Sequence, residues 1–178
     1  EAGLGIVPTS STINQLSIGD ALAVAILNKK KISKKDFKSF HPSGNLGAKL
    51  KTVEDLMLIK DKIPFIHEDS NIKKAVKIIT QKDLGTLVVV NTKGLTVGLI
   101  TDGQIRRTVL KTNNLKDIKV KKIMTKNPIT VSKEILAMKA LSIMNENKVT
   151  CLCVGHNKMK KKTIGIIHIH NILEKTSL

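Results

Sequence analysis

An internal repeat is the feature of this sequence that most limits its fold. Met57 and Met124 lie 67 residues apart, and so do Gly98 and Gly165. Each copy runs through the same order of patterns: a short strand, an amphipathic helix, two strands joined by a polar turn, and a closing helix. Because the strands of one β-α-β-β-α copy are too short to form a core alone, the two copies must pack on each other and leave a cleft between their sheets.

The patterns also place the elements of each copy. In the first copy we predict a helix around 72–79, strands at 86–90 and 97–100, and a helix from Asp102. In the second copy we predict a helix around 137–144, strands at 149–154 and 164–169, a turn across 157–162 and a helix over 171–174. The expected fold class is therefore α/β.

The first fifty residues do not belong to the repeat. Apolar residues at helical spacing follow the turn-forming segment 8–12 and predict a helix of about 15 to 18 residues that ends at Leu27 or Asn28. This helix is apolar nearly all round and so belongs in the interior of a larger body. A short helix over 33–40 and a glycine-containing loop at 41–47 should follow. We thus expect three segments, 1–50, 51–112 and 113–178, and, since the first residue is Glu1 rather than Met, a longer reading frame upstream.

The chain is strongly basic, with 31 lysines and arginines against 14 acidic residues and a formal charge of +17. Such a charge attracts polyanions. Only Arg106 and Arg107 are arginines, however, and Trp and Tyr are absent, whereas nucleic-acid readers rely on arginine forks and aromatic platforms. We therefore expect no nucleic-acid partner, and interpret the lysines at 158–162 as a solvated loop tip.

No apolar run approaches the roughly 20 residues of a membrane span, and the first residues lack the layout of a signal peptide. These features predict a cytoplasmic location and no membrane partner.

Three stretches give the repeat a family resemblance: Asp55-Leu56-Met57, the segment from Gly98 to Arg107, and Ile123-Met124-Thr125 with Pro128. They resemble tandem cystathionine β-synthase (CBS) domains, small regulatory modules that commonly bind adenosine-type ligands. With the first fifty residues included, above all Gly19-Asp20-Ala21 and His41-Pro42-Ser43-Gly44, the whole chain resembles the C-terminal part of the arabinose-5-phosphate isomerases. In that family a sugar isomerase (SIS) domain of α/β type precedes the CBS pair, so 1–50 would be the end of the SIS domain.

The resemblance implies an aldose-ketose isomerase that interconverts D-ribulose 5-phosphate and D-arabinose 5-phosphate for lipopolysaccharide precursors. Glu1 would be one of the active-site carboxylates and His41 the active-site histidine, whose near-neutral pKa suits proton transfer. Ser43 stands where the family has a second glycine. Other catalytic groups and the phosphate-binding loop of the family would lie before Glu1, so we predict no useful turnover by these residues alone, and no cofactor.

The resemblance also implies a ligand cleft in the CBS pair. The family places a Ser or Thr after the last strand and, three residues on, an Asp that accepts both ribose hydroxyls. Here Thr101 and Gln104 stand at these places in the first copy, and His168 and Asn171 in the second. An amide accepts only one side of that pattern, which argues against tight adenosine binding. A nucleotide, a sugar nucleotide or a purely structural interface in a homo-oligomer remain open.

No metal site is expected. We place His168 and His170 on the same face of one strand, but neither a Cys-x-x-Cys pair nor a helical i, i+4 pair accompanies them. Cys151 and Cys153, two apart on a strand, are interpreted as small core residues. The leading hypothesis is thus the isomerase, and the alternative is a stand-alone, non-catalytic CBS module for ligand sensing or dimerisation.

Overall fold

The computed structural model describes residues 5, 7–33, 36, 47, 48, 50–111, 117–156 and 159–176. It divides into two compact units, 1–42 and 43–178. Each is described by itself. The predicted helix over 33–40 and the loop at 41–47 lie almost entirely outside the described residues.

The first unit contains one long helix, α1 (Ser10–Lys29), which is 20 residues in length and so exceeds the prediction. None of its residues is buried, and apolar side chains such as Ile13, Leu16 and Leu22 are at least 60% exposed. Apolar residues occur on all sides of the helix, as the sequence indicates. The described part of this unit therefore leaves the whole apolar surface of α1 uncovered.

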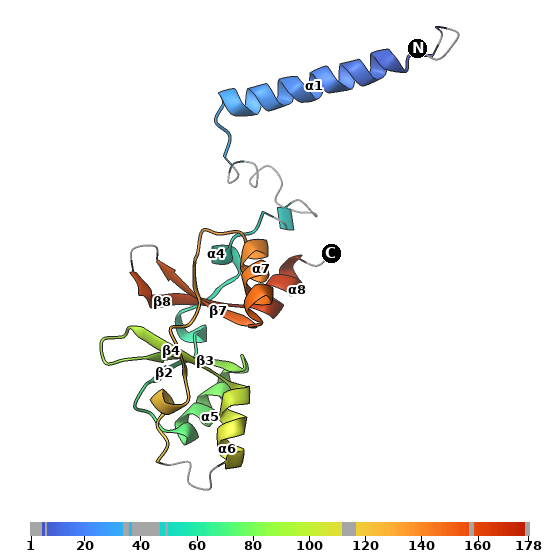
Figure 1. Cartoon of the computed structure of the whole chain (residues 1–178). Helices are drawn as coiled ribbons and strands as arrows, with labels where there is room; N and C mark the ends of the chain where they lie inside the picture. Colours follow the sequence, from blue (N-terminus) through green and yellow to red (C-terminus); the bar gives the residue numbers. More distant parts are fainter. Residues whose placement is uncertain are drawn as a thin grey trace. The chain divides into compact units, whose positions relative to one another are not determined.

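The second unit contains the two copies of the repeat (Figure 1). The elements of the first copy are α4 (Val53–Leu56), β1 (Leu58–Ile59), η1 (Lys60–Lys62), β2 (Phe65–His67), α5 (Ile72–Lys82), β3 (Thr86–Val90), β4 (Thr96–Thr101) and α6 (Asp102–Lys111). Those of the second copy are η2 (Val120–Lys122), β5 (Thr125–Lys126), β6 (Thr130–Ser132), α7 (Ala137–Asn147), β7 (Cys151–His156), β8 (Met159–His168) and α8 (Ile169–Thr176).

Local sequence explains where the central helices begin and end. In α5 the buried residues Ile72, Ala75 and Ile79 recur at helical spacing. The Asn71 side chain accepts a hydrogen bond from the Lys74 backbone N–H at 2.9 Å, which caps the N-terminus. Asp83 ends the helix in the left-handed conformation, with φ of 51°.

Two four-stranded sheets are formed, in the orders β2-β3-β4-β5 and β1-β8-β7-β6. Each sheet takes one short strand from the other copy, because β5 pairs with β4 and β1 pairs with β8. Gly98 and Gly165 make this exchange possible. A Cβ on Gly98 would lie 2.5 Å from Met124 Sδ, and one on Gly165 would lie 2.5 Å from Met57 Sδ.

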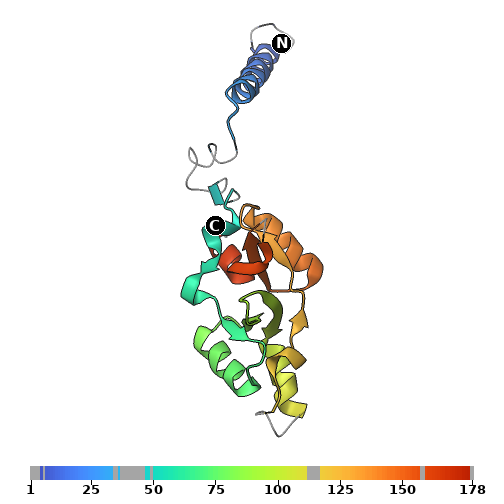
Figure 2. The same ribbon diagram turned by 90° about the vertical axis from the view of Figure 1, so that its left-hand side faces the viewer.

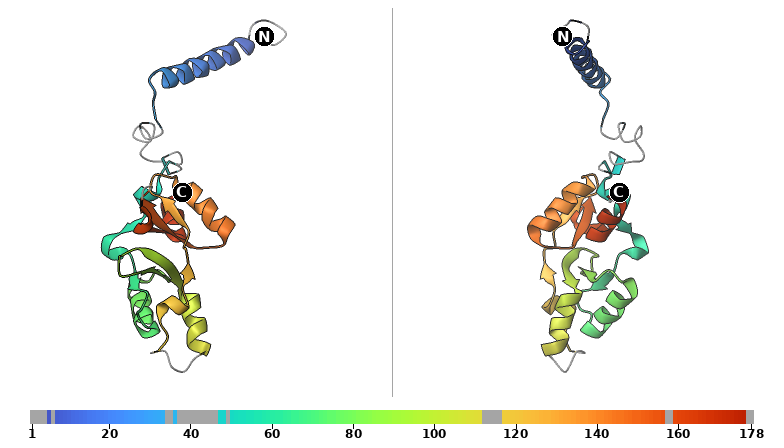
Figure 3. Two further views of the ribbon diagram at one scale, coloured as in Figure 1. Left: turned by 60° about the vertical axis from the view of Figure 1, so that its left-hand side comes forward. Right: turned by 90° about the vertical axis from the view of Figure 1, so that its right-hand side faces the viewer.

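The strands bury residues on both faces. Leu87 and Val89 pack beneath α5 and α6, whereas Val88 between them faces the other sheet. In β7, Leu152 packs beneath α7 and α8, whereas Cys151 and Cys153 face the first sheet. As Figures 2 and 3 show, the two helix pairs cover opposite sides of the paired sheets.

The core between the sheets consists of Ile63, Val88, Cys151, Cys153 and Ile166. Both cysteines are free and buried, as the sequence predicted.

Two expectations for the end of the chain are wrong. The β7–β8 hairpin extends further than predicted, because β8 begins at Met159; Lys161 and Lys162 therefore belong to a strand and not to a turn, although both are exposed. Helix α8 begins at Ile169, so His170 is helical and does not share a strand face with His168. The longer hairpin also changes the repeat: Thr101 corresponds to His168, 67 residues on, but Thr86 corresponds to Cys151, only 65 residues on.

Candidate ligand-binding cleft

A cavity of about 270 Å³ lies between the two copies at the end of β4. Its polar groups are the side chains of four threonines, Asn127 and Lys148. The lining residues are Thr86, Leu99, Thr101, Thr125, Asn127, Pro128, Ile129, Lys148, Val149, Thr150 and Cys151. A mostly apolar wall with a few placed hydroxyls is typical of small-molecule sites. We call this cavity the threonine cleft.

Both predicted residues of the first copy lie at this cleft or beside it. Thr101 is half-buried and lines the cavity. Gln104 is not among the lining residues, because its side chain is bonded within the protein. Gln104 Oε1 accepts from the Thr101 backbone N–H at 2.9 Å, while Nε2 donates to the Ile123 carbonyl and to Thr125 Oγ1, each at 3.0 Å.

These bonds make Gln104 a structural link at the edge of the cleft. Its amide joins the end of β4 to the segment that leads into β5, 21 residues further along the chain. A carboxylate could accept from Thr101 but could not donate to the Ile123 carbonyl. Gln104 therefore fixes one wall of the cleft.

The region that the repeat relates to the 125–150 side of this cleft lies in the first copy and is chemically different. A cavity of about 360 Å³ there is lined by Leu58, Asp61, Lys62, Gln81, Lys82 and Leu84. Lys82 Nζ donates to the Asp61 carbonyl, so two of the lining residues are joined across it. Charged groups replace the threonines of the first cleft, and the two halves of the molecule are not equivalent as ligand sites.

Neither predicted residue of the second copy lines that cavity. Asn171 Oδ1 accepts from the His168 backbone N–H at 3.3 Å, which repeats the Gln104–Thr101 bond. The His168 ring lies 5.0 Å from the His170 ring, centroid to centroid. Burial, and then the neighbouring His170, lower the pKa of His168. Neutral His168 is consistent with its Nδ1 accepting the His170 backbone N–H at 3.3 Å.

Two further predicted residues, Glu1 and His41, lie outside the described residues. Four further residues of the threonine cleft, Thr86, Thr125, Lys148 and Thr150, were not predicted from the sequence. Thr86 is the first residue of β3, and Thr150 immediately precedes β7. A hydroxyl residue at the start of each central strand is the signal that would have identified them.

Two other kinds of feature are absent from the described residues. No three His, Cys, Asp or Glu side chains there are grouped so that they could hold a metal ion. None of the helices described combines the length and the apolarity that crossing a membrane requires.

The CBS domain profile matches residues 53–111 and 120–177. The chain belongs to the CBS domain family, of which it carries a tandem pair.

Similarity that extends beyond the CBS pair identifies a narrower group of relatives. The arabinose 5-phosphate isomerase KdsD of Francisella tularensis is 38% identical over 175 residues, which cover 96% of this chain and 52% of that protein. The enzyme of the same name from Escherichia coli K12 is 34% identical over 171 residues, 96% of this chain and 51% of that protein. An uncharacterized protein of Rickettsia prowazekii is 36% identical over 97% of this chain and 53% of its own length. The chain thus spans about half the length of these relatives, consistent with their C-terminal part.

Solved structures share the fold. An uncharacterized conserved protein of Pyrococcus horikoshii has a TM-score of 0.61 and 25% identity over 72% of this chain and 93% of its own. CBSX2 in complex with AMP has a TM-score of 0.59 and 21% identity over 70% of this chain and 94% of that one. A CBS domain pair in complex with 5-methylthioadenosine and S-adenosyl-L-methionine has a TM-score of 0.60 and 22% identity, and covers 70% of this chain and 94% of its own.

Proposed function

We propose that the chain is the C-terminal part of a cytoplasmic aldose-ketose isomerase that interconverts D-ribulose 5-phosphate and D-arabinose 5-phosphate. One observation carries the proposal. The similarity to the KdsD enzymes covers 96% of the chain and so includes most of the first fifty residues, which a CBS domain alone does not require. A stand-alone CBS module is not favoured, because similarity to the isomerases would then end at the CBS pair.

The proposed chemistry needs a proton shuttle between two adjacent carbons and a group that opens the sugar ring. In this proposal Glu1 belongs to the carboxylates of the site and His41 is its histidine. Both assignments are supported by sequence motifs alone. The phosphate-binding groups would come from residues upstream of Glu1.

The test is an isomerase assay with ribulose 5-phosphate on the complete gene product and on the 178-residue chain. We expect turnover by the complete product, loss of turnover in its His41→Ala variant, and none by the 178-residue chain. His170→Ala, which removes an exposed histidine of the CBS pair, is the matched control and should leave activity intact. An inactive complete product would contradict the isomerase proposal, and an active short chain would contradict the inactivity prediction.

For the CBS pair we propose a regulatory role in a homo-oligomer, with the threonine cleft as the site of a nucleoside-type ligand. The size of the cleft, its apolar wall and its hydroxyls support this proposal. Related folds bound to AMP and to 5-methylthioadenosine support it as well. Gln104 carries an amide and so offers no carboxylate to a ribose diol. Its amide N–H₂ group is also already bonded to the Ile123 carbonyl and to Thr125. We therefore expect weak adenosine binding.

Calorimetry with adenosine, AMP and UDP-glucose tests this role. Gln104→Asp should tighten adenosine binding about tenfold, since hydrogen bonds to charged groups exceed neutral ones by roughly this amount. Asn145→Asp, which adds the same charge on the exposed side of α7, should change nothing. Tighter binding of UDP-glucose than of AMP would instead assign the cleft to a sugar nucleotide. If none of the three binds, the cleft has no ligand role. The remaining role of the CBS pair would then be that of an oligomer interface, which light scattering tests through the mass of the protein in solution.

A further inference from the structure

A larger cavity, of about 560 Å³, lies next to the threonine cleft. The two cavities share only Asn127 and Pro128 among their lining residues. The larger one is bordered by the turn between β3 and β4, by the segment from Met124 to Thr130, and by β8. Its lining residues are Asn91, Leu95, Thr96, Val97, Met124, Lys126, Asn127, Pro128, Thr130 and Lys161. We call it the lysine pocket.

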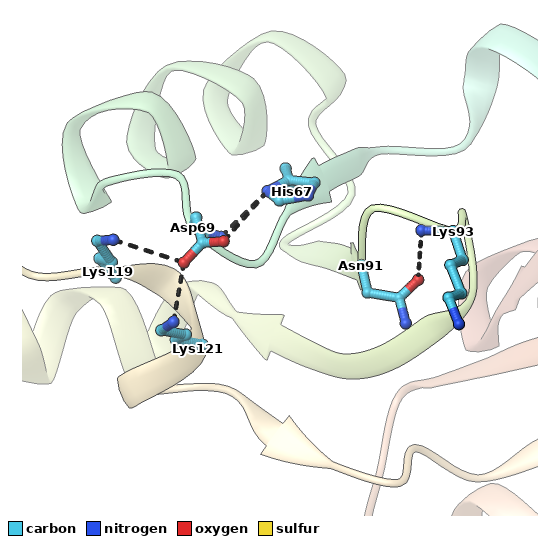
Figure 4. Close-up of polar contacts among 6 residues, drawn as sticks. All are labelled: His67, Asp69, Asn91, Lys93, Lys119 and Lys121. Carbon is cyan, nitrogen blue, oxygen red and sulfur yellow. Dashed lines mark hydrogen bonds and ion pairs between the residues drawn. The ribbon is translucent and has the colours of Figure 1, made fainter.

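The two lysines of the pocket come from different sheets. Lys126 is in β5, which belongs to the first sheet, and Lys161 is in β8, which belongs to the second. Neither ammonium group has an ion pair in the described part of the chain, and no carboxylate lines the pocket. Nearby Lys119 and Lys121 behave differently, since both pair with Asp69, at 3.5 and 2.9 Å (Figure 4).

The turn beside the pocket supplies a further donor. Asn91 Oδ1 accepts from the backbone N–H groups of Lys93 and Leu95, each at 3.0 Å. These two bonds fix the Asn91 amide, and its nitrogen points away from the Lys93 backbone nitrogen (Figure 4). Asn91 is a lining residue of the pocket, and its amide N–H₂ group is therefore held in one orientation as a donor.

The internal repeat provides a comparison within one molecule. Met57 corresponds to Met124, and Ile59 corresponds to Lys126. The cavity at Met57 measures about 350 Å³ and is lined by Met57, Leu58, Ile59, Lys60, Asp61 and Lys62. There an isoleucine replaces the β5 lysine, and Asp61 lies between Lys60 and Lys62 as a carboxylate that the lysine pocket lacks. The combination of two lysines with no lining carboxylate is therefore not a consequence of the CBS fold as such.

We propose that the lysine pocket binds a small organic phosphate, with the phosphate held by Lys126 and Lys161 and a flat ring lying over Leu95, Val97 and Met124. Two cations without a partner favour an anion, and charge-assisted hydrogen bonds from lysine to phosphate are stronger than neutral ones. The apolar floor favours a ring over a bare phosphate ion. This inference does not depend on the isomerase activity or on a ligand in the threonine cleft.

The experiment uses the five methionines as reporters. The 178-residue chain is labelled with ¹³C at the methionine methyl groups and titrated with 5′-AMP, ribose 5-phosphate and adenosine. We expect 5′-AMP to shift the Met124 signal and leave Met57 unchanged, because only Met124 lines the pocket. Ribose 5-phosphate should bind more weakly because it lacks the flat base, and adenosine should cause no shift because it lacks the phosphate.

Variants distinguish the pocket from its surroundings. Lys126→Ala and Lys161→Ala should each raise the Kd of 5′-AMP about tenfold. Lys93→Ala removes a charge from the same turn but does not line the pocket, and should have little effect. Thr101→Val alters the threonine cleft and should leave the Met124 response intact. The proposal is overturned if Met124 does not respond, if Met57 and Met124 respond together, or if Thr101→Val abolishes the response while the lysine variants do not.

Discussion

Burial determines how the two thiols between the sheets will react. Cys153 is fully buried, and burial raises its pKa to about 11; burial also raises the pKa of Cys151. Because the thiolate is the reactive form, neither cysteine should react with Ellman's reagent at pH 8 in the native chain, and both should react in denaturant. An exposed thiol introduced by Ser142→Cys is the control and should react rapidly. Prompt labelling of the native chain would show that the sheets open far more often than their packing indicates.

At His168 the structure predicts a pH dependence of stability. Burial and the neighbouring His170 lower its pKa below 6.5, so the folded state binds fewer protons than the unfolded state. The stabilising effect is complete above pH 6.5 and decreases as the pH falls towards the folded pKa. Urea unfolding at pH 7.5, 6.5 and 5.5 should show this decrease. His168→Thr, which introduces the residue of the equivalent position Thr101, should reduce the slope.

The exchanged strands depend on two glycines. A Cβ at Gly98 would lie 2.5 Å from Met124 Sδ and 3.0 Å from the Thr125 carbonyl oxygen. Gly98→Ala should therefore lower the free energy of unfolding by about 1 to 3 kcal/mol, as overpacking does in other cores. Adding Met124→Ala should recover part of the loss, because it removes the nearer obstacle but not the carbonyl.

Denaturant titration of the single and double variants measures this coupling. Gly19→Ala is the matched control, since nothing lies within 4 Å of a Cβ there and alanine favours a helix. Equal effects of Gly98→Ala and Gly19→Ala would contradict the close approach at β5.

Periodic patterns were sufficient to predict the central helices and strands of each copy. Ile72, Ala75 and Ile79 identify α5, and the apolar run at 86–90 identifies β3. The exchanged strands could not be predicted in this way, because Leu58–Ile59 and Thr125–Lys126 are too short to show a period. The start of β8 was missed because its lysines are typical of a loop; only pairing of Met159 with His156 across the hairpin makes them a strand.

The residues of the candidate site could likewise be predicted only in part. Thr101 was found because a family motif marks it. The bonds of Gln104 could not be foreseen, since its partners lie 19 and 21 residues away and only the exchange of β5 brings them near. Thr86 and Thr150 reach the cleft from opposite sheets, and a cavity between sheets leaves no local pattern in the chain.

On the scale of the whole second unit, one hydroxyl pair joins the two copies. Thr96 Oγ1 and Thr163 Oγ1 lie 2.7 Å apart at equivalent positions of the repeat, and Thr163 is buried. Thr96→Val or Thr163→Val should each cost about 1 kcal/mol in unfolding free energy, because the partner hydroxyl loses its bond. The double variant should cost less than the two single variants together.

Thermal or urea unfolding of the four proteins gives the coupling. Thr108→Val, which removes a hydroxyl bonded within α6, is the control and should be additive with either change. Strict additivity of Thr96→Val and Thr163→Val would mean that the pair does not link the copies.

The exchange of strands has a consequence for how the pair is connected. Because β1 pairs with β8 at the edge of the second sheet, the first and last segments of the CBS pair are neighbours, and Lys51 Nζ donates to the Lys175 carbonyl at 2.7 Å. The two ends of the CBS pair therefore lie close enough together that a short linker could join them. A circular permutant that joins 176 to 51 through a short linker and opens the connection at 112–116 would keep every strand pairing, whereas separating the two copies would leave each sheet one strand short.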